Sequence, residues 1–199
     1  MKISIVIQAG GQSSRMGEDK GLVELCGKPM IQNIIDRLYP FADELIITSN
    51  RPGSYKKFGL QIFEDIYKDY GALAGLHTAL SSASNEMVFV IACDLPFVNI
   101  SLFKFMKNIF EAKPVDLVIP RTDKGYEPFY AFYKKNSCLP LVTDAIESGK
   151  RRLISWFENA VVYPIYEDQL REFDPHLNSF VNINTPDDLE GAQNNCIQV

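Results

Sequence analysis

Short apolar runs rich in β-branched residues alternate with longer segments of helical periodicity along most of this chain. The short runs predict strands near residues 3–8, 44–49, 60–64, 87–93, 115–120, 127–133 and 180–184, with a further candidate at 161–166. The longer patterns predict helices near residues 29–39, 73–83, 101–111, 136–148, 151–158 and 186–194.

The run at residues 87–93 contains no charged side chain and shows no polar alternation. Such a run is typical of a central strand in a parallel sheet that helices cover on both faces. Together with the strand–helix alternation, it predicts an α/β fold, namely a three-layer α/β/α, Rossmann-like domain with a mostly parallel central sheet. No linker or repeat divides the pattern, so we expect one domain over residues 1–199.

Composition narrows the function classes. Of 199 residues, 46% are hydrophobic and 23% charged, which is ordinary for a globular protein. The net charge is −5 and no Lys/Arg-rich run is present, which argues against binding along a nucleic-acid backbone. A small anionic ligand remains compatible, because a metal ion and a few local cations can outweigh a weak global charge.

Other classes of site and location can also be excluded. The cysteines and histidines are widely spaced and contain no C-x-x-C pair, so a zinc site is not expected. The apolar run at residues 3–7 is too short to cross a membrane and leads directly into a glycine-rich loop. We therefore interpret it as a first strand and expect a cytoplasmic protein without membrane attachment.

The segment from Gln8 to Lys20 carries the strongest chemical signal, because it follows the first predicted strand. Loops at the carboxyl ends of parallel strands border the ligand crevice. Gly10 and Gly11 allow main chain to approach a phosphate closely, while Arg15 and Lys20 supply positive charge for a triphosphate. The spacing matches neither a P-loop nor a dinucleotide fingerprint. The alternative is a glycine-rich surface turn with solvated charges.

This segment resembles the signature of the molybdenum cofactor guanylyltransferases, a family of nucleotidyltransferases with a GT-A-like domain. Its residues 9–20 match almost completely, whereas Gln8 replaces the usual Leu, and Tyr70-Gly71-Ala72 stands where the family usually has Gly-Pro. Further matches follow in family order: Leu25-Cys26-Gly27-Lys28-Pro29-Met30, Glu64-Asp65, Leu73-Ala74-Gly75-Leu76, Cys93-Asp94-Leu95-Pro96, Glu127-Pro128, Gly149-Lys150-Arg151-Arg152 and Asn182-Ile183-Asn184-Thr185-Pro186.

The resemblance implies an enzyme that transfers GMP from GTP to molybdenum–molybdopterin and releases pyrophosphate, with Mg²⁺ as its cofactor. Magnesium prefers carboxylate oxygen, and the resemblance assigns the metal to Asp94, at the end of the most apolar strand. The implied catalytic residues are Arg15, Lys20 and Asp94. The implied nucleotide-binding residues are Gln8, Ala9, Gly10, Gly11, Ser13, Lys20, Asp65, Gly75 and Asp94. The implied acceptor-binding residues are Glu127, Arg151, Asn182 and Asn184.

Several of these residues also have purely structural interpretations. Asp94 could serve as a turn or helix-cap residue, and Asp65 as a solvated loop carboxylate. Asn182 and Asn184 are spaced as polar alternation on an edge strand, and Arg151 could lie in a solvated helix start.

Alternatives for the whole protein are a related cytidylyl- or sugar-phosphate nucleotidyltransferase, or a non-catalytic carrier of GTP or the molybdenum cofactor. The resemblance also implies transient contact with molybdoenzymes or with other proteins of cofactor biosynthesis.

Overall fold

The computed structural model describes residues 1–10 and 19–193. The strands of its main sheet are β1 (Ile3–Gln8), β4 (Glu44–Thr48), β5 (Gln61–Phe63), β6 (Met87–Ala92), β7 (Leu117–Thr122), β8 (Gly125–Tyr126), β9 (Tyr130–Lys134) and β10 (Val162–Tyr166). A separate small hairpin pairs β2 (Glu24–Leu25) with β3 (Lys28–Pro29). The α-helices are α1 (Met30–Leu38), α2 (Pro52–Tyr55), α3 (Gly71–Ser82), α4 (Ile100–Ala112), α5 (Lys135–Glu147), α6 (Glu167–Phe173) and α7 (Pro186–Gln193).

Short 3₁₀ turns complete these connections: η1 (Lys20–Leu22), η2 (Tyr39–Phe41), η3 (Lys56–Phe58), η4 (Phe157–Asn159) and η5 (Asn178–Phe180). The main sheet has the strand order β10-β7-β9-β6-β1-β4-β5, with β8 paired to β7. Strand β9 runs antiparallel to both β6 and β7, whereas β1, β4, β5 and β6 are parallel to one another. The sheet is therefore mostly parallel, as the sequence predicts.

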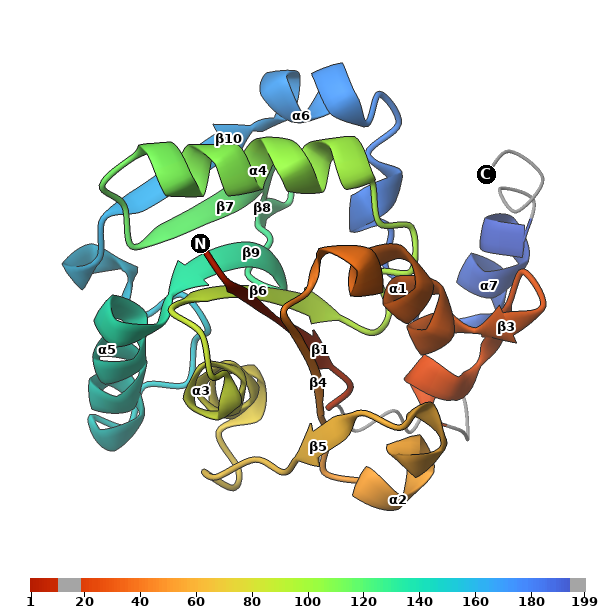
Figure 1. Cartoon of the computed structure of the whole chain (residues 1–199), viewed down its shortest axis with the longest axis horizontal. Helices are drawn as coiled ribbons and strands as arrows, with labels where there is room; N and C mark the ends of the chain where they lie inside the picture. Colours follow the sequence, from red (N-terminus) through yellow and green to blue (C-terminus); the bar gives the residue numbers. More distant parts are fainter. Residues whose placement is uncertain (11–18, 194–199) are drawn as a thin grey trace.

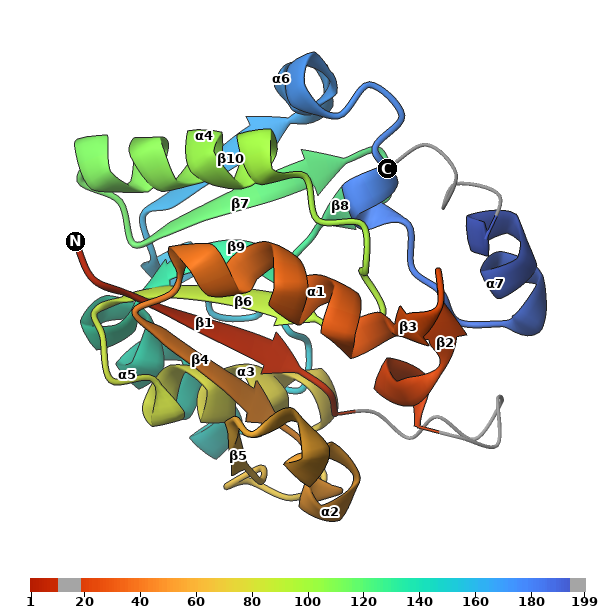
Figure 2. The same cartoon turned by 45° about the vertical axis from the view of Figure 1, so that its right-hand side comes forward.

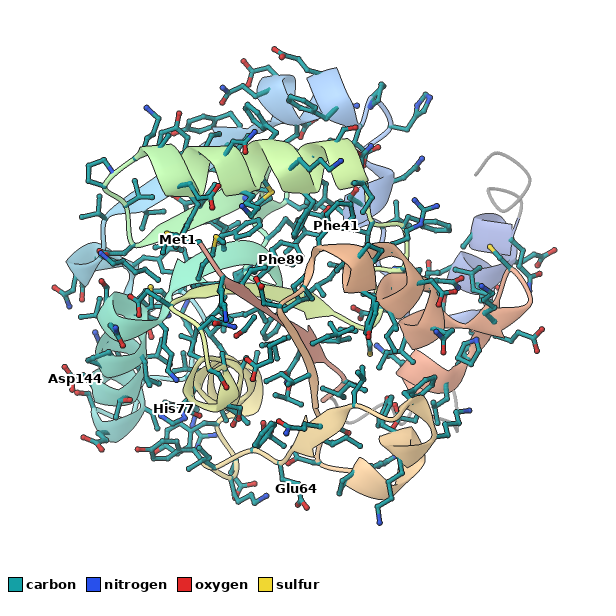
Figure 3. The ribbon with its side chains drawn as sticks, viewed as in Figure 1. Met1, Phe41, Glu64, His77, Phe89 and Asp144 are labelled. Carbon is teal, nitrogen blue, oxygen red and sulfur yellow. The ribbon has the colours of Figure 1, made fainter. Side chains whose placement is uncertain are left out.

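Helices cover both faces of this sheet, with α1 and α4 on one face and α3 and α5 on the other (Figure 1). The side chains of alternate residues in β1 face opposite sides of the sheet. Ile5 belongs to the core beneath α1 and α4, while Val6 belongs to the core against α3 and α5. Phe89 of β6 lies on the first of these faces and His77 of α3 on the opposite one (Figure 3). The three-layer α/β/α fold predicted from the sequence is confirmed.

Local residue chemistry explains where two of the helices begin. Asn99 precedes α4 and its side-chain oxygen accepts the Leu102 N–H at 3.0 Å, which satisfies one free donor of the first turn. Before α7, the Asp188 N–H donates to the Thr185 hydroxyl, and the Asp188 carboxylate accepts the Thr185 N–H in return. This reciprocal capping agrees with the helix start that the sequence predicts.

Two predicted elements are wrong, and several short ones were missed. Residues 180–184 form the end of η5 and an irregular segment rather than a strand, and residues 151–158 form turns rather than a helix. The sequence reasoning missed α2, α6, β8 and the β2–β3 hairpin. Pro29 ends β3 immediately before α1 instead of lying in its first turn.

In the described part of the chain, no helix is both long enough and apolar enough to cross a bilayer.

The carboxyl ends of β1, β4 and β6 all point toward the side of the molecule that holds the β2–β3 hairpin, with α7 packed beyond that hairpin (Figure 2). The glycine-rich loop begins at this edge of the sheet, which therefore positions the candidate site.

Candidate active site

Two adjoining cavities open at the carboxyl edge of the parallel strands. The first has a volume of about 280 Å³ and its wall combines the end of β1 with the turn after β6. Its lining residues are Gln8, Ala9, Gly10, Asp19, Lys20, Ala92, Cys93, Asp94, Leu95, Glu127, Pro128, Phe129 and Asn182. Many of the site residues predicted from the sequence thus line this first cavity.

The second cavity has a volume of about 480 Å³ and lies toward β4 and β5. It shares several wall residues with the first: Gln8, Ala9, Gly10, Asp19 and Phe129. Its remaining lining residues are Ser49, Asn50, Arg51, Asp65, Tyr67, Lys68, Asp69, Gly71 and Ala72. The end of β1 and the two residues after it therefore lie in the wall that the two cavities share.

Lys20 lies in the wall of the first cavity and contacts two residues that are distant from it in the sequence. Its Nζ donates a hydrogen bond to Asn184 Oδ1 at 2.5 Å and lies 3.9 Å from Asp94 Oδ2. Burial raises the pKa of the Asp94 carboxyl, whereas the Lys20 ammonium opposes that rise. Asp94 is held in place by the chain around it, because the Ile183 N–H donates to the Asp94 carbonyl at 3.0 Å.

Gln8 fills the boundary between the sheet and α3. Its side-chain oxygen accepts a hydrogen bond from the Thr48 hydroxyl on the neighbouring strand β4. A β-carbon at residue 75 would lie only 2.2 Å from Gln8 Nε2, and one at residue 10 would lie 2.8 Å away. Glycine is therefore required at both positions while Gln8 keeps this conformation. Gly75 acts here by leaving room for Gln8 in the wall of the cavities.

Asp65 in the second cavity forms a reciprocal pair with Asn50, a residue that the sequence reasoning missed. Asn50 Nδ2 donates to Asp65 Oδ2 at 2.6 Å, and the Asp65 N–H donates to Asn50 Oδ1 at 3.1 Å. The two residues follow β4 and β5, which are adjacent parallel strands. The family resemblance implied Asp65, whereas the signal that could have found Asn50 is its place just after a parallel strand, at the edge where ligands bind.

The predicted acceptor-binding residues divide between the cavities. Glu127 and Asn182 line the first cavity, where Glu127 accepts the Thr122 hydroxyl at 3.2 Å and burial raises the pKa of its carboxyl. Arg151 lies beside the second cavity instead. It donates to the Asp69 carbonyl at 2.7 Å and its guanidinium stacks over the Tyr70 ring, 5.4 Å from the ring centre.

The residues present suit a magnesium ion that is held jointly with substrate phosphates. Among the residues that the structure describes, no three His, Cys, Asp or Glu side chains are grouped as a complete metal cluster. Mg²⁺ is commonly held by one or two carboxylates, water and phosphate oxygens rather than by an all-protein cage. Asp94 is a desolvated carboxylate in the cavity wall and fits that role.

The structure thus brings together Gln8, Ala9, Gly10, Lys20, Asp94, Glu127, Asn182 and Asn184, with Asp65 next to them in the adjoining cavity. The predicted residues Gly11, Ser13 and Arg15 lie outside the described residues. Asp19 and Phe129 line both cavities although the sequence reasoning assigned neither to the site.

Comparison with known families decides which group of proteins this architecture represents. The model of the MobA-like NTP transferase domain matches residues 5–162, which include most of β1, the wall that the two cavities share, and Asp94. The chain belongs to this family. The family resemblance inferred from the glycine-rich segment and the later motifs is thereby confirmed, as is the nucleotidyltransferase type of the fold.

Individual relatives extend the similarity over nearly the whole chain. A probable molybdenum cofactor guanylyltransferase of Peptoclostridium acidaminophilum is 37% identical over 191 residues, which cover 94% of this chain and 86% of the relative. A molybdenum cofactor guanylyltransferase of Vibrio parahaemolyticus is 36% identical over 190 residues, covering 94% and 92% of the two chains. This MobA-like chain is therefore similar to guanylyltransferases along its length.

Solved structures agree with this family assignment. Molybdopterin-guanine dinucleotide biosynthesis protein A from Archaeoglobus fulgidus superposes with a TM-score of 0.84 at 30% identity, covering 98% of this chain and 100% of that chain. A 4-diphosphocytidyl-2C-methyl-D-erythritol synthase from Anaerococcus prevotii has a TM-score of 0.72 at 17% identity, with 100% and 96% of the chains covered. The second likeness shows the fold alone.

Proposed function

We propose that this protein transfers GMP from GTP to the phosphate of molybdenum–molybdopterin, forming the guanine dinucleotide form of the molybdenum cofactor and releasing pyrophosphate. The observation that carries this proposal is the similarity to molybdenum cofactor guanylyltransferases over 94% of the chain. The two adjoining cavities, with Lys20 and Asp94 in the wall of the first, support the proposal because a transfer reaction needs space for two substrates.

In the proposed reaction, an oxygen of the acceptor phosphate attacks the α-phosphorus of GTP. A new phosphorus–oxygen bond forms while the bond to the bridging oxygen of the β-phosphate breaks, and pyrophosphate leaves with that electron pair. Both substrates are polyanions, so the protein's task is to neutralise and align them. No covalent intermediate on a side chain is required.

The chain's own residues supply that alignment. The main chain at Ala9 and Gly10 can approach the nucleotide closely because Gly10 carries no side chain. The Lys20 ammonium lies where it can neutralise the triphosphate and then the departing pyrophosphate. We assign Arg15 a similar role on the strength of the family resemblance.

Asp94 is the residue that we propose to hold Mg²⁺. When bound, the ion would supply charge neutralisation at the α-phosphate and a template for the attacking oxygen.

Asn50 and Asp65 face the second cavity, where their amide and carboxylate groups offer hydrogen bonds to the guanosine part of GTP. Glu127 and Asn182 would contact the acceptor in the first cavity. A cytoplasmic location is part of this proposal.

A direct product assay tests the proposed function. The purified protein is incubated with Mg²⁺, molybdenum-loaded molybdopterin and each of GTP, CTP, ATP and UTP in turn, and the products are identified by mass. We expect a dinucleotide and one equivalent of pyrophosphate with GTP. Preferential use of CTP would identify a cytidylyltransferase, and binding of GTP without product would indicate a carrier. Either result would overturn the proposal.

A further inference from the structure

Tyr55 is a buried tyrosine whose hydroxyl reaches the candidate site from α2. The residue is fully buried, and its hydroxyl donates a hydrogen bond to the carboxylate of Asp19. Burial raises the pKa of the Tyr55 hydroxyl, and the nearby Asp19 charge raises it further. The hydroxyl therefore stays protonated at neutral pH and remains a donor to Asp19.

The same hydroxyl occupies the space that a side chain would need at Gly21, the residue on the other side of Lys20. A β-carbon at residue 21 would lie 2.8 Å from the Tyr55 oxygen and 3.3 Å from its ring. Gly21 is buried, and its lack of a side chain allows its main chain to lie close to Tyr55. Tyr55 thus hydrogen-bonds to Asp19 before Lys20 and excludes a side chain at Gly21 after it.

Asp19 is placed to use this hydrogen bond. It immediately precedes η1, yet its side chain makes no capping bond to that turn and points to Tyr55 instead. Its main-chain carbonyl accepts the Leu22 N–H at 2.9 Å. Side chain and main chain of Asp19 are therefore both anchored, which fixes the point from which the flexible Lys20 side chain extends.

We propose that Tyr55 is a positioning residue for Lys20 in the binding of the nucleotide triphosphate. The inference rests on the proposed function only in taking Lys20 as the cation that meets the phosphates. A lysine side chain has four rotatable bonds, so its ammonium reaches a target reliably only when its main chain is fixed. From this anchored position the ammonium lies between Asn184 and Asp94.

The ring and the hydroxyl of Tyr55 have separable roles. The ring packs against Phe58 with 6.2 Å between ring centres and belongs to the main core beneath α1 and α4. Tyr55→Phe keeps that packing and removes only the hydrogen bond to Asp19. Because Asp19 is partly exposed, water can replace the lost donor and the variant is expected to fold.

The test measures binding of GTP and of inorganic pyrophosphate by calorimetry, together with kcat and KM for GTP. In Tyr55→Phe we expect affinity for both ligands to fall about tenfold, with guanosine binding unchanged, because the lost hydrogen bond to a charged group acts on the phosphate side only. Tyr39→Phe removes a hydroxyl from an exposed tyrosine and serves as the matched control.

A double-mutant cycle identifies Lys20 as the residue through which Tyr55 acts. In a Lys20→Ala background, Tyr55→Phe should change pyrophosphate affinity by less than about twofold. Equal losses in the two backgrounds, or an equal loss of guanosine binding, would show a general packing role and overturn the inference. Unchanged pyrophosphate binding in Tyr55→Phe would do the same. These binding results stand even if the wild-type protein forms no dinucleotide, so failure of the proposed reaction remains distinguishable.

Discussion

Asp94 illustrates how one residue can be assigned from its place in the chain and then tested. It follows the apolar strand β6 and lines the first cavity beside Lys20. We predict that Asp94→Asn lowers the rate of GMP transfer by about 100-fold or more while GTP affinity falls much less. The physical reason is that the proposed magnesium ligand, and with it electrostatic stabilisation of the transition state, is lost, whereas the proposed phosphate contact of Lys20 persists. Single-turnover rates and GTP titrations separate the two effects.

Asp144→Asn provides the control for that experiment. Asp144 is an exposed aspartate of α5, on the opposite side of the sheet from the Phe89 face (Figure 3). The substitution makes the same change of charge and should leave transfer unaffected. A near wild-type rate in Asp94→Asn at saturating Mg²⁺ would show that Asp94 is not the metal ligand.

His77 of α3 gives a prediction for stability rather than activity. It is 7% exposed, and its Nδ1 lacks a hydrogen-bond partner among the described residues. Burial lowers the pKa of His77 from its usual value of 6.5, although the Glu147 charge on α5 opposes this. The Tyr67 ring packs edge-on against the imidazole, with 4.8 Å between ring centres. The folded protein therefore favours the neutral imidazole.

The sign of the pH effect follows from that lowered pKa. Below about pH 6.5 the unfolded chain binds a proton more readily than the folded protein, so the free energy of unfolding should fall as the pH is lowered. The fall should level off once the pH is below the folded-state pKa. We predict that His77→Leu reduces this dependence, measured by urea unfolding at pH 7.5, 6.5 and 5.5. His176→Gln, at an exposed histidine, should not.

At the scale of elements, length separates what the sequence predicts from what it misses. The long or strongly apolar elements β1, β6, α4 and α5 have enough residues for their periodicity to show. By contrast, α2 has four residues and β2, β3 and β8 have two each, so no period can be recognised. These short elements exist because of tertiary contacts, such as those of buried Tyr55 in α2.

The segment at residues 180–184 shows how a wrong element can still hold useful residues. The sequence predicts a strand whose asparagines share one face and serve the acceptor. The segment is irregular, yet Asn182 lines the first cavity and the Asn184 side-chain oxygen accepts a hydrogen bond from the Lys20 ammonium. Only the folded structure shows this second contact, because the two residues are 164 positions apart.

That geometry predicts different effects for the two asparagines. Asn182→Ala should weaken molybdopterin binding about fivefold, through one lost hydrogen bond, and spare GTP. Asn184→Ala should weaken GTP binding about tenfold, since the Lys20 ammonium loses a partner and with it a preferred position. Separate titrations with GTP and molybdopterin measure the two effects.

Asn178→Ala offers a control in η5, since that residue lies earlier in the same segment. Its substitution should leave both titrations near wild type. Equal effects of Asn182→Ala and Asn184→Ala on both ligands would contradict the division between them and would indicate a shared packing role for the segment.

At the scale of the whole molecule, the sequence predicts which strand ends carry the site but not how the site is divided. Lys20 and Asp94 were identified because polar residues after parallel strands meet at one edge of the sheet, whereas Gln8 and Asp65 were implied by the family resemblance. The walls of the two cavities combine residues from distant segments, and Phe129 lines both cavities. Packing between distant segments also brings Arg151 to Asp69, whereas the family resemblance implies a role for Arg151 at the acceptor.

Ligand binding should therefore stabilise the entire fold, because both cavities are built from the ends of the central strands. A ligand that binds only the folded state at 100 times its Kd raises the free energy of unfolding by about 2.7 kcal/mol. For a chain of this size, that corresponds to a rise in Tm of about 5–10 °C. We predict such a rise with GTP and Mg²⁺, measured by thermal unfolding.

Two comparisons make this last prediction specific. With ATP at the same concentration the rise should be smaller, because the groups of Asn50 and Asp65 that face the second cavity would be mismatched to adenine. With GTP and a chelator, the rise should shrink in the wild type but not in Asp94→Asn, since only the wild type keeps the carboxylate that we propose to hold the ion. An equal rise with ATP would contradict guanine selectivity, and a chelator effect of the same size in both proteins would place the magnesium on the nucleotide alone.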